Sequence, residues 1–455
     1  MSAQPKNSGR LQDQKHHDFK AQLDFAGKQR LKKPQRLSIT KMCNEIEQPF
    51  TFLVLGDIHF GKFADSPEFR GEENHKITYT KQPSRKLSLI DEVLKLPERP
   101  TAIFIPGDLT SIASPSEFKG CIAMAMDIAE ALSISRQNVI VTYGNHDTNW
   151  SICDLGIEKD KRSADSEYEY VAASIGNLYA PVVNCNEVGP VLGSGVYIVN
   201  DHTLFVLNSG FYCVAEQVYR HGRLGSAQLE WIKEALVRYS SNTGWKILMV
   251  HHHPFNYRYP TPIEDVSCLE EGAELVDLAG SMGIDLLFHG HRHHPRLFTE
   301  MRTEWKFPLT LLCAGSVAVG AHHRDTGLIP NLFHVVSLKR RLENGAAFGN
   351  VISFEFTTDG WKPVSNRPAT PLDHVHWFGS LVSEQENKDA IKNFITELSE
   401  RSGCETILLP ERNDLPPSLM CCSLDQLNSQ LSIIANSCGF RVVGKYPSEV
   451  ALMKL

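Results

Sequence analysis

Side chains that can bind metal ions follow several apolar, strand-like segments of the chain. In chain order they are Asp57, His59, Asp108, Asn145, His146, three histidines at 251–253, His291 and His293. Carboxylate, imidazole and amide groups suit Mn, Fe, Zn or Co rather than a metal that selects thiolates. Each group ends a segment such as FTFLVLG, TAIFIPG or IDLLFHG. The sequence therefore indicates a metal centre assembled from several strand ends.

The elements that must position these side chains alternate in type. Short β-rich runs such as NVIVTYG and WKILMV alternate with amphipathic helical patterns such as SEFKGCIAMAMDIAEAL and SAQLEWIKEALVRYS. This alternation predicts a layered α/β domain. The carboxyl ends of strands in such a sheet share one crevice, so residues distant in sequence converge there. A lone histidine after a strand is more often structural, but five such segments in order predict one shared site.

Five motifs, GDIH, GD, GNHD, HHHP and GHRH, occur in the order typical of the calcineurin-like metallophosphoesterases. The chain resembles this family over about residues 50 to 320. The resemblance implies an α/β metallophosphoesterase fold, in which two packed mixed β-sheets are flanked by helices in four layers (αββα). We expect a small C-terminal α/β unit in addition, to which no part of the family pattern corresponds.

The resemblance also implies a centre with two divalent metal ions, and the choice among Mn, Fe, Zn and Co stays open. By position in the motifs, the ligands of one ion are Asp57, His59 and His293, those of the other are Asn145, His291 and one histidine of 251–253, and the bridge is Asp108. Because His251 is the first residue past the strand WKILMV, we favour it over His252.

Two such ions, about 3.5–4 Å apart, would lower the pKa of a bridging water and clamp the phosphoryl oxygens for attack by hydroxide. His146 follows a ligand directly and is not itself a ligand in the family. We therefore predict that it faces the leaving oxygen as a general acid or hydrogen-bond donor. Two roles are open for Asp147, which either orients the imidazole of His146 or caps the turn that begins DTNW.

The stretch from LFVLNSG to GRLGSAQLEWIKEAL resembles a segment of the class III cyclic nucleotide phosphodiesterases, although Asn208 replaces the usual aspartate. This resemblance favours phosphodiesters, and we expect the substrate to be a small phosphate ester of the nucleotide type. A general phosphomonoesterase, a DNA nuclease and a scaffold protein are the alternatives. All the ligand positions are filled, which argues against a scaffold, and the net charge of −7 argues against nucleic acid as a partner.

The composition divides the chain into four parts. Residues 1–45 read as a flexible basic tail, since 1–41 hold ten Lys or Arg against three Asp. Residues 46–365 form the metallophosphoesterase domain, residues 366–379 a linker, and residues 380–455 a small C-terminal α/β domain whose role stays open. Within the large domain, the polar insertion from Gly61 to Pro83 is placed where a loop would face the substrate.

The cysteines and the hydropathy bear on the compartment. The eleven cysteines are scattered without a CxxC pair, which is typical of reduced thiols. No run of eighteen apolar residues suggests a membrane span or a secretion signal. We therefore expect a cytoplasmic protein that has no contact with a membrane, and its oligomeric state stays open.

Overall fold

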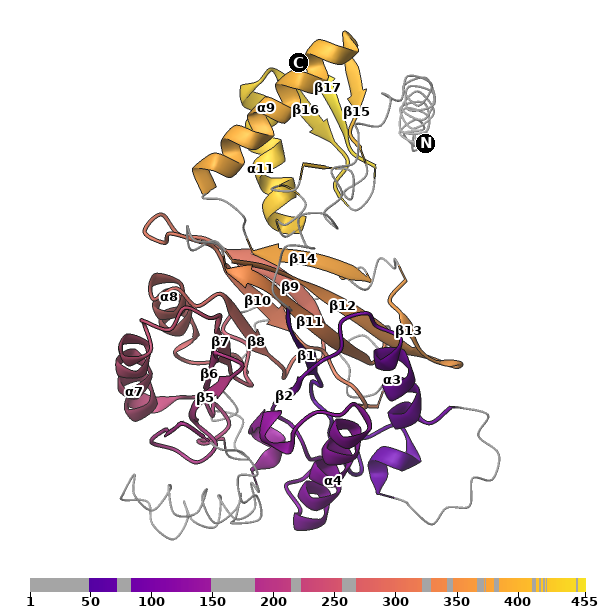
Figure 1. Ribbon diagram of the computed structural model, residues 1–455, viewed down its shortest axis with the longest axis vertical. Helices are drawn as coiled ribbons and strands as arrows, with labels where there is room; N and C mark the ends of the chain where they lie inside the picture. The colour runs from indigo at the N-terminus through magenta and orange to yellow at the C-terminus, as the bar shows by residue number, and fades with distance from the viewer. Residues whose placement is uncertain are drawn as a thin grey trace, which may run out of the picture. The chain divides into compact units, whose positions relative to one another are not determined.

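The computed structural model in Figure 1 forms two compact units, residues 46–381 and residues 1–45 together with 382–455. The structure describes residues 49–71, 83–148, 185–213, 222–255, 267–320, 329–341, 347–365, 372, 374–379, 384–410, 415–416, 419, 422, 424–446 and 449–455. The tail expected at residues 1–45 lies outside this part of the chain. The two units are described separately below.

The larger unit holds two seven-stranded sheets. The strand order of the first is β13-β12-β11-β1-β2-β3, with β14 also paired to β12, and that of the second is β4-β5-β6-β7-β8-β10-β9. The strands of the first sheet are β1 (Phe50–Val54), β2 (Ala102–Pro106), β3 (Val139–Thr142), β11 (Leu332–Arg341), β12 (Ala347–Thr357), β13 (Gly360–Pro363) and β14 (Val375–Gly379). Those of the second are β4 (Glu187–Val188), β5 (Gly195–Val199), β6 (His202–Val206), β7 (Lys246–Met249), β8 (Leu286–His289), β9 (Arg296–Glu300) and β10 (Leu309–Cys313).

The helices of this unit cover the outer faces of the sheets. Helices α3 (Arg85–Leu94) and α4 (Pro115–Ala131) lie on one side, and α7 (Gly225–Arg238) and α8 (Gly272–Ser281) lie on the other (Figure 1). Helix α4 begins at a strong start signal, because Ser114 Oγ accepts a hydrogen bond from the N–H of Glu117 and Pro115 occupies the first turn.

The core between the sheets contains a cluster of aromatic rings. Phe52 and Phe104 of the first sheet have ring centroids 4.6 Å apart, and Phe104 stacks at 5.9 Å on Phe288 of the second sheet. Ile103 and Ile105, which flank Phe104, point instead to the helices. Because alternate side chains of a strand face opposite sides, β2 packs in both directions and all five of its residues are buried. These layers confirm the predicted αββα fold.

Parallel pairing brings the ends of the site-bearing strands together. β1, β2 and β3 are parallel neighbours in the first sheet, and β6, β7, β8 and β10 are parallel neighbours in the second. The carboxyl ends of β1, β2 and β3 therefore lie at one edge of their sheet, as do those of β7 and β8. Each of these five strands leads directly into one of the motifs.

Part of the expected linker belongs to the first sheet. Within residues 366–379, the strand β14 pairs antiparallel with β12, from Val375 opposite Ile352 to Gly379 opposite Phe348. His376 and Phe378 of this strand are buried. The alternation of buried and exposed side chains in VHWFG is thus that of a β-strand. The strand is difficult to predict from the sequence because residues typical of loops precede it.

The C-terminal unit has a small antiparallel sheet of order β15-β17-β16. Its elements are α9 (Glu384–Ser402), β15 (Thr406–Leu408), α11 (Leu424–Ser437), β16 (Phe440–Val443) and β17 (Ala451–Lys454). The two helices contact each other, and each contacts the sheet around a core that includes Ile391, Leu431 and Leu452. The hairpin expected in FRVVGKYPSEVALMKL is the pair β16–β17.

An α-helix that crosses a bilayer needs about 20 predominantly apolar residues. Within the described residues, no helix has both the necessary length and the necessary apolar character.

Candidate metal centre

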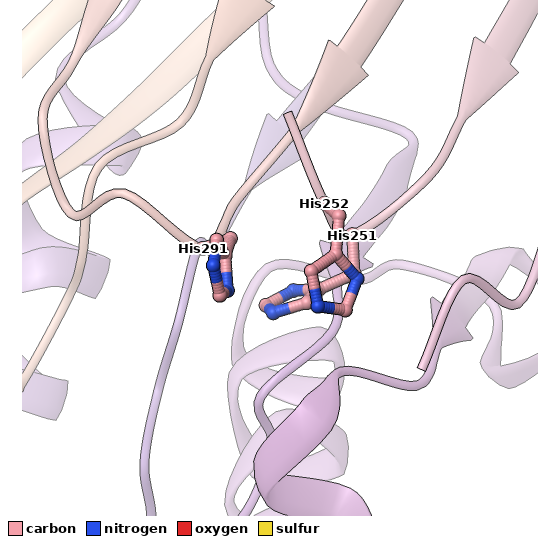
Figure 2. Close-up of side chains that lie close together, drawn as sticks. All are labelled: His251, His252 and His291. Atoms are coloured by element: carbon pink, nitrogen blue, oxygen red, sulfur yellow. The ribbon is translucent and has the colours of Figure 1, made fainter. Parts of the chain in front are cut away.

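The loops after five strands carry the predicted ligands to one place. Three groups of side chains each bring their ligand atoms within 4.8 Å of one another. The groups are His251, His252 and His291; His59, Asp108 and His146; and Asp57, Asp108 and His293. In Figure 2 the rings of the first group, which come from the loops after β7 and β8, lie side by side.

Five of the predicted ligands have a left-handed backbone. They are Asp57, His59, Asp108, His291 and His293, with φ between 39° and 73°. This conformation costs an ordinary residue about 1–2 kcal/mol, so the surrounding structure must hold it. Two of the bonds that do so run from His59 N–H to the carbonyl of Asp108 (2.9 Å) and from Ser316 Oγ to the carbonyl of Asp57 (2.7 Å). Strain concentrated in this way is typical of a functional site.

The contacts divide into two sets joined by Asp108. On one side, His59 Nε2 lies 3.0 Å from His293 Nε2. On the other, Asn145 Oδ1 lies 3.1 Å from His251 Nε2 and 3.0 Å from His291 Nδ1. Asp108 Oδ2 is 3.3 Å from His59 Nε2 and 3.4 Å from His251 Nε2. One carboxylate oxygen therefore lies beside both sets, the position that a bridging ligand needs.

The side chains of His251 and His252 have different environments. His251 Nδ1 lies 2.8 Å from the carbonyl of Pro106, which leaves Nε2 to face Asn145 and Asp108. His252 Nδ1 lies 2.8 Å from Ser209 Oγ, and its Nε2 lies 3.8 Å from the sulfur of Cys213. Because a backbone carbonyl fixes the tautomer of a ligating histidine in the way seen for His251, the contacts favour His251 over His252 as a ligand.

His146 is anchored at the same place through its backbone and its ring. Its N–H donates to Asp108 Oδ1 (2.9 Å), and its Nδ1 lies 3.1 Å from the carbonyl of Ser111. The ring is only partly buried, and its centroid is 4.8 Å from that of His59. If Nδ1 carries the proton and donates to Ser111, Nε2 is the atom available for proton transfer.

Asp147 is fully buried, and its carboxylate accepts hydrogen bonds from backbone N–H groups on two loops. The donors are Gly144 at 2.9 Å, Thr110 at 2.9 Å and Leu109 at 3.1 Å. These bonds join the loop after β2 to the loop after β3. None of the three runs to the His146 ring or to a residue that follows Asp147, so they match neither of the two roles left open for it.

The sequence pattern of calcineurin-like phosphoesterases matches residues 50–295, which is more than half of the chain. The chain belongs to this family. A comparison with curated proteins found no match.

Similar solved structures include three with low identity to this phosphoesterase. A dimetal phosphatase from Danio rerio is 13% identical, with 70% of this chain and 98% of that chain covered and a TM-score of 0.39. A purple acid phosphatase from yellow lupin seeds is 12% identical, with 68% and 51% covered and a TM-score of 0.38. GAP50, the anchor in the inner membrane complex of Plasmodium, is 11% identical, with 72% and 92% covered and a TM-score of 0.34. At these scores the likenesses carry no inference about substrate.

The residues of this phosphoesterase fit divalent metal ions. Asp57 Oδ2 is buried and, within the described residues, has no hydrogen-bond partner, which is costly for a carboxylate unless a cation lies beside it. Two ligands on one ion with bonds of about 2.1 Å would be roughly 3.0–3.4 Å apart, depending on coordination geometry. The distances from His59 Nε2 to its two neighbouring ligand atoms, and from Asn145 Oδ1 to its two, fall in that range. The family and these clusters support a metal-dependent phosphoester hydrolase.

Burial sets the charge states in the centre. It raises the pKa of Asp57 and, with Asp108 as the second cause, raises the pKa of Asp147 to about 7. It lowers the pKa of His59 and of His291, which keeps both imidazoles neutral, as ligands must be. Burial also acts to raise the pKa of Asp108, but the neighbouring imidazoles, His251 above all, hold it well below its usual range.

Three further residues position the site, and two of them, Ser209 and Gln228, belong to the segment that resembles the class III cyclic nucleotide phosphodiesterases. Ser111 joins His146 to His59, since its Oγ donates to the carbonyl of His59 at 2.7 Å. Gln228 of α7 bonds both the N–H and the carbonyl of Asn208, each at 3.0 Å. Ser209 follows Asn208, and its Oγ accepts a hydrogen bond from the N–H of His252 at 3.0 Å. These contacts depend on side chains that meet only in the folded chain.

Proposed function

We propose that this phosphoesterase hydrolyses phosphodiesters at a centre with two divalent ions held by Asp57, His59, Asp108, Asn145, His251, His291 and His293. The observation that carries the proposal is the position of Asp108, whose Oδ2 lies 3.3 Å from His59 and 3.4 Å from His251. When bound, two such ions would activate water at neutral pH and neutralise charge on the phosphoryl oxygens.

The protein residues have distinct tasks in this reaction. Asp108 supplies a carboxylate whose Oδ2 lies beside His59 of one set and His251 of the other. His146 protonates the leaving oxygen from Nε2, while the carbonyl of Ser111 holds its Nδ1. Asp147 fixes the loop that carries Asn145 and His146, through its bonds to Gly144 and Thr110.

The preference for diesters rests on the segment that resembles class III cyclic nucleotide phosphodiesterases. Asn208, where that group has aspartate, is buried, and its Nδ2 donates to the carbonyl of Leu192 at 2.7 Å while its Oδ1 accepts from Gly210 N–H at 3.0 Å. A carboxylate could make only the second of these bonds. The replacement of aspartate by Asn208 thus changes a hydrogen bond between two loops and leaves the candidate metal ligands unchanged. This supports retention of the diesterase chemistry.

The test compares bis-nitrophenyl phosphate with nitrophenyl phosphate under Mn, Fe, Zn and Mg in turn. We expect metal-dependent hydrolysis, with a higher kcat/KM for the diester. Cyclic nucleotides and single-stranded DNA form two further arms, which separate a nucleotide phosphodiesterase from a nuclease. A higher kcat/KM for the monoester with every metal would replace the diesterase by a general phosphatase. Stoichiometric metal binding without hydrolysis of any substrate would favour a scaffold.

A further inference from the structure

Residues 62–65, which follow the candidate ligand His59, are held in place beside the centre by several hydrogen bonds. Phe63 N–H donates to Ser111 Oγ at 3.0 Å, and the carbonyl of Phe63 accepts from Gly320 N–H at 2.8 Å. Asp65 N–H donates to the carbonyl of Ala318 at 2.9 Å, and its carboxylate pairs with Arg85 at 2.7 Å. Residues 62–65 are therefore fixed on two sides, by the loops after β2 and after β10.

The turn that enters this segment depends on a glycine. Gly61 has φ +121°, a conformation that other residues rarely adopt, and a Cβ there would collide with the carboxylate of Glu117. That carboxylate accepts hydrogen bonds from the N–H groups of Ser111 (3.1 Å) and Ile112 (2.9 Å). The same acidic side chain thus packs closely against the turn at Gly61 and binds the loop whose Ser111 carbonyl holds His146.

The fixed segment presents an aromatic ring next to His146. The centroid of Phe63 lies 5.6 Å from that of the His146 ring, with the two planes at 89°. The ring keeps part of its surface exposed, and the ammonium of Lys62, an exposed residue, lies 4.9 Å from its centroid. A partly exposed aromatic ring costs free energy to hydrate and is a surface on which a second ring can pack.

We propose that Phe63 and Lys62 form a leaving-group subsite that selects phosphoesters whose leaving group carries an aromatic ring, nucleosides being the biological class that fits. The inference rests on the proposed function, because His146 marks the side of the leaving group only if it protonates the leaving oxygen. Phe63 contacts the ring of the leaving group, and Lys62 attracts the anionic substrate. Since the backbone of the segment is already fixed, little ordering entropy is lost on binding.

The test measures binding of two stable phosphonates to the full chain loaded with Mn²⁺, by isothermal titration calorimetry. Benzylphosphonate and cyclohexylmethylphosphonate have nearly the same size and charge, and only the first carries an aromatic ring. We expect wild type to bind benzylphosphonate at least about fivefold more tightly, within the range known for stacking on aromatic side chains. Phe63→Leu should lose that preference, while Phe63→Tyr should keep it.

Two controls separate the subsite from a loss of fold or of charge. Metal content and melting temperature of the Phe63 variants should equal those of wild type, and the affinity of Phe63→Leu for cyclohexylmethylphosphonate should be unchanged. Lys62→Gln should weaken both phosphonates by the same factor, whereas Lys95→Gln, at an exposed lysine beyond the end of α3, should weaken neither.

The outcomes for the subsite and for the proposed function are distinct. Three results overturn the subsite, even if the protein hydrolyses diesters. They are equal affinity of wild type for the two phosphonates, binding of neither phosphonate, and a preference for benzylphosphonate that survives in Phe63→Leu. A preference that depends on Phe63 in a protein that hydrolyses no phosphoester shows that Phe63 binds rings, but it rejects the proposed function and with it the leaving-group role of this subsite.

Discussion

The Nε2 atoms of His59 and His293 lie 3.0 Å apart, although 234 positions separate the two residues. Burial lowers the pKa of His59 well below its ordinary value, so this imidazole is neutral at pH 7. The two imidazoles in this arrangement offer either a single hydrogen bond or a pair of ligands to one cation. The second arrangement explains why both residues accept a left-handed backbone.

Metal removal should therefore destabilise the protein. We expect EDTA to lower the melting temperature by about 5 °C relative to the Mn-loaded protein, because a ligand that binds only the folded state stabilises it. Differential scanning calorimetry measures the shift. His293→Asn, which weakens one set of ligands, should show a smaller shift, and equal melting temperatures of loaded and chelated wild type would contradict the metal centre.

Asp108→Asn should abolish turnover and lower the bound metal. A neutral amide compensates two cations poorly, and Asp108 contacts residues of both sets. Elemental analysis of the purified variant gives the metal content, and hydrolysis of bis-nitrophenyl phosphate gives the activity. Near-normal activity with full metal occupancy would show that Asp108 is not the bridge.

Alanine variants of the adjacent residues His251 and His252 should differ in the amount of metal that the protein retains. We expect His251→Ala to lose about one ion of two, since its Nε2 faces Asn145 and Asp108. His252→Ala should retain both ions and lose stability instead, because it breaks the bond to Ser209. If elemental analysis shows the larger metal loss in His252→Ala, the assignment of these two residues is reversed.

His146→Ala should keep its metal and lose catalytic rate. If this imidazole protonates the leaving oxygen, kcat should fall by about 10²- to 10⁴-fold. The loss should be smaller for nitrophenyl esters than for alkyl esters, because nitrophenolate leaves without a proton. A metal loss as large as that of Asp108→Asn would make His146 a ligand.

A buried histidine outside the centre should make stability depend on pH. Burial lowers the pKa of His334 from 6.5 to about 4, and its ring lies between Ala314 O and Ser353 Oγ, each at 2.9 Å. The folded state then binds fewer protons than the unfolded state between these pH values, so stability is lost as pH falls from 6.5 through 4. The full effect is about 3 kcal/mol.

Urea unfolding in EDTA at pH 7.5 and pH 5 measures this dependence. The change in the free energy of unfolding between the two pH values is compared between wild type and His334→Gln. This comparison removes the contribution of titrating groups that both proteins share, including His202, whose pKa burial also lowers to about 4. The variant should lose less stability on acidification. An equal loss in both proteins would show that His334 does not cause the dependence.

The sequence by itself determined the fold class and the set of candidate ligands. The β-rich runs are long enough to identify β1, β2, β3, β7 and β8, and parallel pairing places the carboxyl ends of β1, β2 and β3 at one edge of the first sheet and those of β7 and β8 at one edge of the second. Asp57, Asp108 and Asn145 could thus be assigned to one site from local pattern and order alone. The C-terminal hairpin was equally visible, because its two strands are close in sequence and separated by a turn.

Only the tertiary structure decided how neighbouring polar residues divide their tasks. His251 and His252 are adjacent and chemically identical, and they differ because one ring meets Pro106 and the other meets Ser209. In the sequence Asp147 could either orient His146 or cap a turn, whereas its carboxylate binds backbone N–H groups of two loops. Strand β14 likewise forms because β12 offers it a free edge. Each of these outcomes depends on groups tens to hundreds of positions away, or on backbone donors that carry no sequence signal, so no local pattern contains it.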